Sequence, residues 1–241
     1  MNTCPFFLDY KQLIPIALIS NHMNYAIIVA GGSGSRMKSD KPKQFLLLNG
    51  MPVLMHTIKA FYNSSAKPNI LLVLNTTFHD YWAGLCREHS FDIPHQIIAG
   101  GNERFNSVKN ALNTIAQDGL IAVHDAVRPV VSDELITRCF VDASKHGATI
   151  PVTSSRDSLR KKEGGTTRAI NRDDILIVQT PQVFKSEILR KAYNQEFTPE
   201  FTDDASVVEK AGFSISLVEG DFKNIKITYP EDLQMASIFL R

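Results

Sequence analysis

A glycine-rich stretch over residues 30–44 has the composition of a phosphate site. It reads Ala-Gly-Gly-Ser-Gly-Ser-Arg-Met and continues to Lys-Pro-Lys-Gln. Its glycines, which let backbone N–H groups approach a phosphate chain closely, are Gly31, Gly32 and Gly34. Arg36 can fork across phosphate oxygens, and Lys43 supplies a mobile point charge. The stretch therefore predicts a triphosphate cradle, with Lys43 as its first candidate catalytic residue.

The same stretch departs from two common phosphate motifs. No Gly-Lys-Ser/Thr closes it, as a P-loop would, and Met37 stands where a dinucleotide fingerprint has its third glycine. A glycine-rich turn alone is equally typical of a tight strand-to-helix connection, and either cation alone is typical of a solvated surface. The combination of glycines with two cations favours phosphate binding.

Two further segments carry polar side chains after predicted strands. The segment Gly-Gly-Asn-Glu-Arg-Phe-Asn-Ser-Val contains Ser107, which can bond to a base or phosphate or support the start of a helix. The segment His-Asp-Ala-Val-Arg-Pro contains Asp125 and Arg128, which either bind a ligand or cap the strand end. We expect His124 to be a packed, hydrogen-bonded structural group, and the chain clusters too few ligands to predict a metal site.

A fourth candidate segment lies near the C terminus. Residues 220–228 alternate like an edge strand, which predicts Asn224, Lys226 and Thr228 on one side. From there Lys226 could reach the phosphates. The alternative is a charge on the solvent side of an edge strand.

An alternation of strand-like and helical patterns must position these segments. Strand-like runs occur at Ala26–Val29, Ile70–Leu74, Gln96–Ile98, Ile121–Val123 and Ala148–Val152. Helical patterns occur at Pro52–Tyr62, Thr77–His89, Glu103–Ala116 and Ser132–Lys145. The alternation predicts an α/β fold with a doubly wound, mostly parallel sheet and helices on both faces. Because ligands of such sheets bind beyond the carboxyl ends of the strands, we expect the candidate segments to share one rim.

The alternation breaks at residues 153–175. This stretch is rich in Arg and Lys and has little apolar periodicity, and Glu163-Gly-Gly165 predicts the turn of a hairpin. The stretch is too short for a core of its own, so we expect a protruding β-arm that packs on a second subunit. Beyond it, further elements are predicted: helices at Lys185–Tyr193 and Asp203–Ala211, a strand at Ser214–Val218 and a closing helix from Pro230.

Length and composition restrict the class of protein. The chain has 241 residues, a formal net charge of +1 and 44% hydrophobic residues, which fits one globular domain over residues 23–241. Near-neutral charge gives no reason to expect nucleic acid or an anionic membrane as partner, and no apolar run approaches the length of a membrane span. The three cysteines, Cys4, Cys86 and Cys139, suggest neither a disulfide framework nor a zinc site. We therefore expect a cytoplasmic protein.

Residues 1–22 do not resemble a signal peptide, because Asp9 precedes Lys11 where a basic start is required. Met23 stands two residues before a strand-like run. Our hypothesis is that Met23 is the natural start and that residues 1–22 come from a start codon assigned too far upstream.

Taken in order, seven motifs resemble those of the 2-C-methyl-D-erythritol 4-phosphate cytidylyltransferases of the non-mevalonate isoprenoid pathway. Five of them lie in the four segments above, because the first segment carries both Ala-Gly-Gly-Ser-Gly-Ser-Arg-Met and Lys-Pro-Lys-Gln and the last carries Asn-Ile-Lys-Ile-Thr. The other two are Gln-Thr-Pro-Gln and Thr-Asp-Asp-Ala-Ser. The similarity runs from about Tyr25 to the C terminus. It implies a Rossmann-like nucleotidyltransferase fold, CTP and a polyol phosphate as substrates, and Mg²⁺ or another divalent cation held mainly by CTP phosphates. It also implies a homodimer in which the arms are exchanged between sites.

The resemblance also implies a role for each matching residue. Three catalytic residues would stabilise charge on the triphosphate: Arg36, Lys43 and Lys226. The CTP pocket would be lined by Ala30, Gly31, Gly32, Gly34, Gly101, Asn102, Ser107, Asp125 and Ala126. The methylerythritol phosphate would contact Asp125, Arg128, Ser158, Arg172, Thr180 and Thr202, with Ser158 and Arg172 contributed by the arm of the other subunit.

The arm departs from the family pattern. Asp157-Ser158 replaces the usual Asp-Thr, and Thr153-Ser-Ser155 before it looks inserted. Because serine keeps the hydroxyl, the contact is expected to survive.

Three alternatives remain at this point. A ribitol 5-phosphate cytidylyltransferase shares several motifs, although the segment from Thr202 to Glu209 favours the methylerythritol enzyme. A dinucleotide-dependent oxidoreductase is disfavoured because Asn75 stands where an acidic residue should end the second strand. A non-catalytic nucleotide-binding module is disfavoured by the joint presence of Arg36, Lys43, Asp125 and Lys226.

Overall fold

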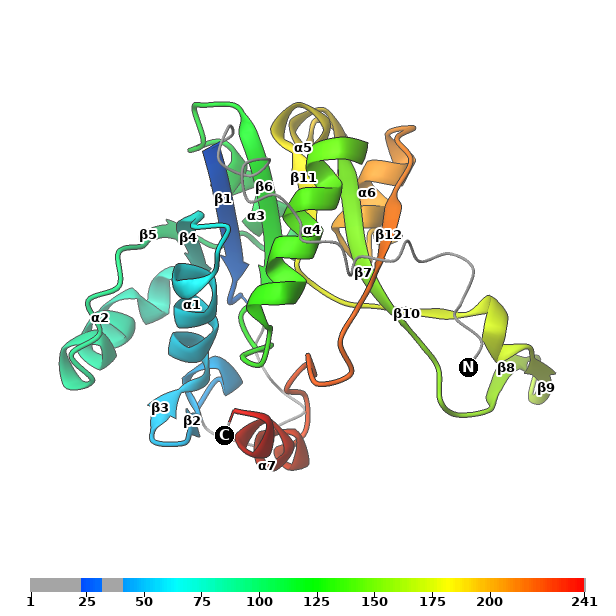
Figure 1. Ribbon diagram of the computed structural model, residues 1–241, viewed down its shortest axis with the longest axis horizontal. Coiled ribbons are helices and arrows are strands. Elements are labelled where there is room, and N and C mark those ends of the chain that lie inside the picture. The colour runs from blue at the N-terminus through cyan, green and yellow to red at the C-terminus, as the bar shows by residue number, and fades with distance from the viewer. Residues whose placement is uncertain (1–22, 32–40, 241) are drawn as a thin grey trace.

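The computed structural model of the protein describes residues 23–31 and 41–240 (Figure 1). The hypothesis about residues 1–22 therefore concerns residues outside this description. The same holds for three predicted site residues of the glycine-rich stretch, Gly32, Gly34 and Arg36.

Within the described residues, the main sheet has eight strands. They are β1 (Met23–Val29), β4 (Asn69–Leu74), β5 (Gln96–Ala99), β6 (Gly119–Asp125), β7 (Ala148–Ser154), β10 (Leu176–Val178), β11 (Gln182–Lys185) and β12 (Ser216–Glu219). The neighbours β5, β4, β1 and β6 are all parallel, as predicted. On the other side of β6 lies β11, which is antiparallel to both β6 and β7, and β7 also pairs with β10 and β12.

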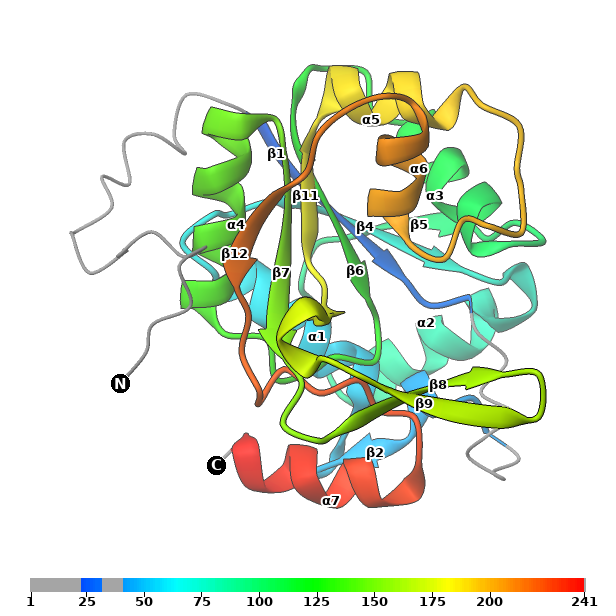
Figure 2. The same cartoon turned by 90° about the vertical axis from the view of Figure 1, so that its right-hand side faces the viewer.

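Helices cover both faces of this sheet, as predicted (Figures 1 and 2). One face packs against α1 (Val53–Asn63), α2 (His79–Glu88) and α4 (Asp133–His146), and the other against α3 (Arg104–Leu112), α5 (Ser186–Tyr193) and α6 (Asp204–Lys210). Side chains alternate between the faces, so that Ile28 packs with the first group and Ile27 with the second. Both side chains are fully buried, and the two cores fix the strand register.

The closing helix α7 (Pro230–Phe239) packs on a smaller apolar cluster with Val127 and Ile227. A short hairpin of β2 (Leu47–Leu48) and β3 (Met51–Pro52) contributes Leu48 to this cluster. The cluster anchors the C-terminal part of the chain close to the end of β6.

The predicted arm is confirmed as a hairpin of β8 (Leu159–Glu163) and β9 (Thr166–Ile170). Its turn is formed by Gly164 and Gly165, which both have positive φ, at 50° and 86°. Figures 1 and 2 show the arm leaving the body of the molecule beside β7 and β10. It therefore protrudes as the composition predicts.

Three features of the sheet differ from the sequence predictions, and the first is β10, which was not predicted. The antiparallel strand β11 was not predicted, because its four residues run directly into the helical pattern of α5. Residues 220–228, which were predicted as an edge strand, form no strand. A backbone hydrogen bond from Ile227 N to Val127 O (2.9 Å) holds this segment instead of a ladder.

The carboxyl ends of the parallel strands meet at one edge. The backbone N–H of Ala30 donates to Val73 O (2.9 Å), that of Gly100 to Leu74 O (2.9 Å) and that of Ala126 to Val29 O (3.1 Å). Each of these donors is the first residue after its strand. The segments named above are therefore brought to a common rim.

Candidate active site

A buried carboxylate, Asp125, lies at the centre of this rim. It is the last residue of β6 and is 8% exposed. Its Oδ2 lies 3.0 Å from Lys226 Nζ and accepts a hydrogen bond from Arg128 Nε at 3.3 Å. Arg104 Nε lies 3.9 Å from Oδ1. Cations from three separate segments thus converge on one side chain.

The cations decide the charge of Asp125. Burial by itself raises the pKa of this carboxyl, but Arg104, Lys226 and Arg128 outweigh burial and hold the pKa well below its usual range. The group is therefore ionised at neutral pH. Burial lowers the pKa of Arg128 below its usual value, although Asp125 acts in the opposite direction; an arginine still remains a cation under these conditions.

His124 and Thr180 fix the backbone on which Asp125 stands. The Asp125 N–H donates to Thr180 Oγ1 (3.1 Å), and that hydroxyl lies 3.0 Å from His124 Nδ1. His124 Nε2 lies 3.2 Å from Arg128 O. Since a carbonyl only accepts, Nε2 carries the proton, Nδ1 accepts from Thr180, and every polar group in the chain of hydrogen bonds is satisfied.

The sequence prediction that His124 is a packed structural group is confirmed. The ring is fully buried and meets Phe61 edge-on at 4.9 Å between centroids. Burial lowers the pKa of His124 to about 3, so the imidazole is neutral at physiological pH. The hydroxyl of Thr180, which was predicted to contact substrate, is directed to His124 and the backbone of Asp125.

Arg104 connects Asp125 to the start of α6. Its Nη2 donates to Asp204 Oδ2 at 2.6 Å, and Asp204 Oδ1 accepts from Tyr193 Oη, also at 2.6 Å. Burial alone lowers the pKa of Arg104, but Asp204 and Asp125 outweigh it and raise the pKa above the usual value. Sequence reasoning gave neither Arg104 nor Asp204 a role. Both lie inside quoted motifs, but nothing in the sequence shows that residues 100 positions apart form a pair.

Ser107 joins two glycine turns on the rim. Its Oγ accepts a hydrogen bond from Gly101 N at 3.0 Å, and a Cβ placed on Gly31 would lie 3.6 Å from the same oxygen. A Cβ on Gly101 would lie 2.4 Å from the Cβ of Asn106, so only glycine fits there. The structure therefore brings Gly31, Gly101 and Ser107 together, as predicted for the nucleotide pocket, and Asn102 is exposed beside them.

Lys43 approaches the same rim from another segment. Its Nζ donates to Ile227 O at 3.0 Å, so it lies next to the residue that follows Lys226. The neighbouring Gln44, to which sequence reasoning gave no role, is buried and donates from Nε2 to Ala30 O at 2.9 Å. The side chain of Lys226 is 43% exposed although it pairs with Asp125. Two ammonium groups thus lie at the mouth of the sheet.

The polar contacts of Asp125 in the described structure do not include the remaining predicted residues, Thr202, Ser158 and Arg172. Thr202 is exposed and stands just before α6, where its N–H donates to Ser206 Oγ at 3.1 Å. Ser158 is exposed at the base of the arm, and Arg172 donates from Nη1 to Arg156 O at 3.1 Å. In Figure 1 the hairpin of β8 and β9 lies apart from the carboxyl ends of β1 and β6.

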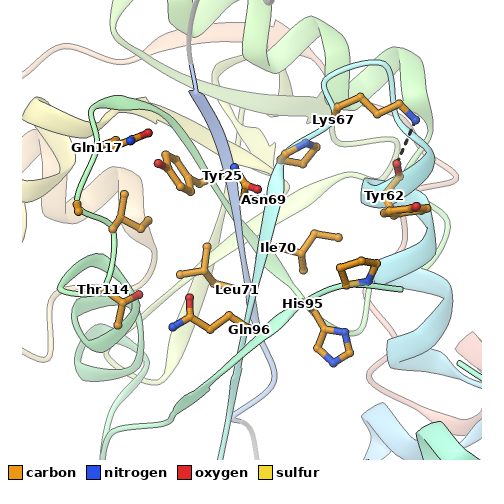
Figure 3. A pocket seen from close by; sticks show the side chains of 14 residues that line it. Tyr25, Tyr62, Lys67, Asn69, Ile70, Leu71, His95, Gln96, Thr114 and Gln117 are labelled. Carbon is orange, nitrogen blue, oxygen red and sulfur yellow. Dashed lines mark hydrogen bonds between the residues drawn. The ribbon is translucent and has the colours of Figure 1, made fainter. Parts of the chain in front are cut away.

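A groove of about 980 Å³ lies at the opposite, amino ends of the strands (Figure 3). Tyr25 of β1, Asn69 of β4 and Gln96 of β5 line it. Lys67, the one lysine or arginine among its described lining, donates to Tyr62 O at 3.3 Å. This lining lacks the grouped cations of the rim around Asp125, so the rim is the better candidate for a triphosphate.

Two searches of the described residues concern metals and membranes. Over residues 23–31 and 41–240, no group of three or more His, Cys, Asp and Glu is placed to hold a metal ion. The helices in this part of the chain are all too short or too polar to cross a membrane.

Comparison with known proteins gives a family match. Residues 24–241 match the family model described as 2-C-methyl-D-erythritol 4-phosphate cytidylyltransferase. A relative of that name from Bacteroides fragilis is 51% identical over 215 residues, which cover 89% of this chain and 98% of the relative. A second, from Bacillus anthracis, is 38% identical over 89% of this chain and 96% of its own length.

Solved structures give the same result. The enzyme of that name from Francisella tularensis is 31% identical, with a TM-score of 0.75 over 90% of this chain and 99% of its own. The one from Thermus thermophilus is 29% identical, with a TM-score of 0.73 over 91% of this chain and 100% of its own.

The buried, neutral His124 predicts a pH dependence of stability. Its folded pKa of about 3 lies below the unfolded value of 6.5, so the unfolded chain binds one more proton between these values. The free energy of unfolding that comes from keeping His124 neutral is fully present above pH 6.5 and is lost as the pH falls toward 3. The free energy of unfolding then changes by up to about 1.4 kcal/mol per pH unit. Urea unfolding from about pH 6.5 to about pH 4.5 should show this extra slope in the native protein and not in His124→Asn. Equal slopes in the two proteins would contradict the assignment.

Proposed function

The chain belongs to the 2-C-methyl-D-erythritol 4-phosphate cytidylyltransferase family, and from this premise we propose how its residues carry out the transfer. The enzyme transfers a cytidylyl group from CTP to 2-C-methyl-D-erythritol 4-phosphate in isoprenoid biosynthesis. Its products are 4-diphosphocytidyl-2-C-methyl-D-erythritol and pyrophosphate. The family decides against the ribitol 5-phosphate and non-catalytic alternatives. The observation that carries the proposal is the convergence of Lys43, Lys226, Arg128 and Arg104 on the rim around Asp125.

The proposed step is a direct displacement at phosphorus. An oxygen of the acceptor phosphate forms a bond to the α-phosphorus of CTP, while the bond from that phosphorus to the β-bridging oxygen breaks. Pyrophosphate leaves with the electron pair of the broken bond. The acceptor phosphate is already ionised at neutral pH, so no general base is required, and catalysis depends on positioning and charge neutralisation.

Lys43 and Lys226 supply the charge in this proposal. Both ammonium groups lie at the carboxyl edge of the sheet, where a triphosphate cradled by the glycine turns would meet them. Arg36, which lies outside the described residues, is assigned to the same task from the family motif. Each fixed cation favours the transition state because charge on the leaving pyrophosphate grows there.

Asp125 binds and orients in this proposal. A carboxylate whose pKa is held well below its usual range cannot take a proton at neutral pH, but it can accept hydrogen bonds from hydroxyl groups of CTP or the acceptor. Arg128 is held between Asp125 and Asn224 O (2.8 Å), so it maintains the shape of this site. Thr202 would contact the acceptor from the loop before α6.

We assign Mg²⁺ mainly to the phosphate oxygens of CTP. The described carboxylate at the site, Asp125, already faces cations at both oxygens, which fits an ion with few protein ligands. When bound, the ion would neutralise part of the triphosphate charge.

A cytoplasmic location also stays a prediction.

We propose a homodimer in which each arm completes the neighbouring site. Support comes from the base of the arm, where four consecutive apolar residues are exposed: Ile175, Leu176, Ile177 and Val178. They include all of β10, and contiguous exposed apolar surface of this kind is typical of protein interfaces. In the dimer, Ser158 and Arg172 would reach the acceptor bound to the other subunit.

The reaction itself is tested by product analysis. CTP, methylerythritol phosphate and Mg²⁺ should yield a product with the mass of diphosphocytidyl-methylerythritol together with pyrophosphate, and EDTA should abolish its formation until Mg²⁺ is restored. Ribitol 5-phosphate at the same concentration serves as the competing acceptor. A higher kcat/KM with ribitol 5-phosphate would contradict the proposed acceptor.

Removal of the Lys43 ammonium should affect turnover strongly. Lys43→Ala is expected to lower kcat by about two to three orders of magnitude, the scale for loss of one preorganised charge donor. Lys67→Ala is the matched control, because its ammonium also bonds to a backbone carbonyl but lies in the opposite groove. Steady-state kinetics check both variants. A loss below about tenfold in Lys43→Ala, with unchanged CTP affinity, would refute the role.

The exchanged arm is tested by mixing defective subunits. Lys43→Ala and Arg172→Ala chains with different affinity tags can be coexpressed and purified through both tags. In a mixed dimer one site combines an intact Lys43 with an intact arm, so about half of the native turnover should return at an acceptor concentration where each parent is inactive. Mixed dimers no more active than their parents would show that the arm does not act across the interface.

A further inference from the structure

The turn Gln-Thr-Pro-Gln at residues 179–182 carries two glutamines that the proposed mechanism does not use. It connects β10 to β11, the antiparallel strand between β6 and β7, and contains a cis peptide bond before Pro181. Gln179 is 6% exposed and Gln182 is 1% exposed. A buried side-chain amide fixes the position of its hydrogen-bond partners, because an unpaired buried amide would lower the stability of the fold.

Gln179 holds the segment that carries Lys226. Its Nε2 donates to Asp221 O (2.8 Å), and its Oε1 accepts from Asp221 N (3.1 Å). This pair of bonds joins the start of the segment to the turn. The fit is close, because a Cβ on Gly220 would lie 2.7 Å from Gln179 Oε1.

Asn224 adds a second connection between the turn and this segment. Its Nδ2 donates to Thr180 O at 2.8 Å, and its own carbonyl accepts from Arg128 Nη1 at 2.8 Å. The main chain shortly before Lys226 is therefore fixed from both sides. The position of the Lys226 ammonium, at the exposed end of a long side chain, therefore depends on this fixed backbone.

Gln182 holds the start of α6 next to Thr202. Its Nε2 donates to Asp203 Oδ2 (2.8 Å), and its Oε1 accepts from Ala205 N (2.9 Å). Asp203 is the N-cap of α6 and also accepts from Ser206 N at 2.9 Å. The loop that presents Thr202 is thereby tied to β11.

We infer that Gln179 and Gln182 are positioning residues of the transfer reaction. Gln179 sets the place of Lys226 at the triphosphate, and Gln182 sets the place of Thr202 at the acceptor. The inference rests on the roles given to Lys226 and Thr202 in the proposed function. Between the two glutamines, Thr180 holds Asp125, so one turn aligns three segments of the site.

The two glutamines should have separable kinetic effects. A displacement of about 1 Å in a reacting or charge-bearing group can cost up to about a hundredfold in rate. Loss of the Gln179 amide is therefore expected mainly to lower kcat, and loss of the Gln182 amide mainly to raise the KM for the acceptor. A purely structural role would lower stability without this division between kcat and KM.

Double-mutant cycles test the inference. Gln179→Leu should lower kcat at least about tenfold in the native background, but should cause no further loss in Lys226→Ala, because the group it positions is already absent. Gln182→Leu should raise the KM for methylerythritol phosphate about tenfold and cause no further rise in Thr202→Val. Full additivity in both cycles would overturn the inference.

Gln195→Leu is the matched control for lost hydrogen bonds. Gln195 Nε2 donates to Ala192 O and Val207 O, and neither residue has a role in the proposed reaction, so this variant should keep native kcat and KM. If Gln179→Leu fails to fold, Gln179→Glu keeps the acceptor for Asp221 N and enters the same cycle. Native kinetics in a folded Gln179 variant would overturn its role. If Lys226→Ala itself keeps native kcat, the proposed function fails at that residue, whatever the glutamine variants show.

Discussion

A buried carboxylate needs positive charge around it, and Asp125 obtains this charge from three parts of the chain. Arg104 comes from the start of α3, Arg128 from the turn after β6, and Lys226 from the C-terminal segment. These three segments are far apart in sequence and meet only through the fold. The ion pairs at Asp125 therefore hold these three segments next to one another.

The same arrangement places positive charge at the rim. Arg104 is shared between Asp125 and the buried Asp204, whereas Lys226 keeps a partly exposed side chain and Lys43 donates to the neutral carbonyl of Ile227. Phosphate groups entering the rim would meet cations that are held in place before they bind. Such preorganisation avoids reorganisation of the site during the reaction.

The antiparallel strand β11 supports this site from within the sheet. It inserts between β6 and β7, so the turn before it lies behind Asp125 and not at the edge of the sheet. From that place Gln179, Thr180 and Gln182 each bond to a different segment. A continuous parallel sheet would have no such turn at the carboxyl edge, because its connections return as crossover helices.

The sequence by itself determined the class of fold, the arm and the family. Hydrophobic periodicity reports which face of an element is buried, glycine pairs report turns, and several ordered motifs together report ancestry. It also predicted Lys43 from cations beside a glycine turn, Asp125 and Arg128 from their place after a strand, and Lys226 from an alternating segment near the C terminus. Apart from the order of the motifs, these signals are local, and each can be detected within a short stretch of the chain.

Only the tertiary structure decided how those residues work together. The pairing of Arg104 with Asp204, the hydrogen bonds of Gln179 and the inward direction of Thr180 join residues that are distant in sequence. The position of β11 in the sheet is likewise set by pairing with β6 and β7 and not by its own four residues. Such contacts depend on how loops are brought together after the cores have packed, and no local pattern encodes that distance. The sequence therefore predicted most of the charged groups that the described structure brings to the rim, and the fold determined their partners.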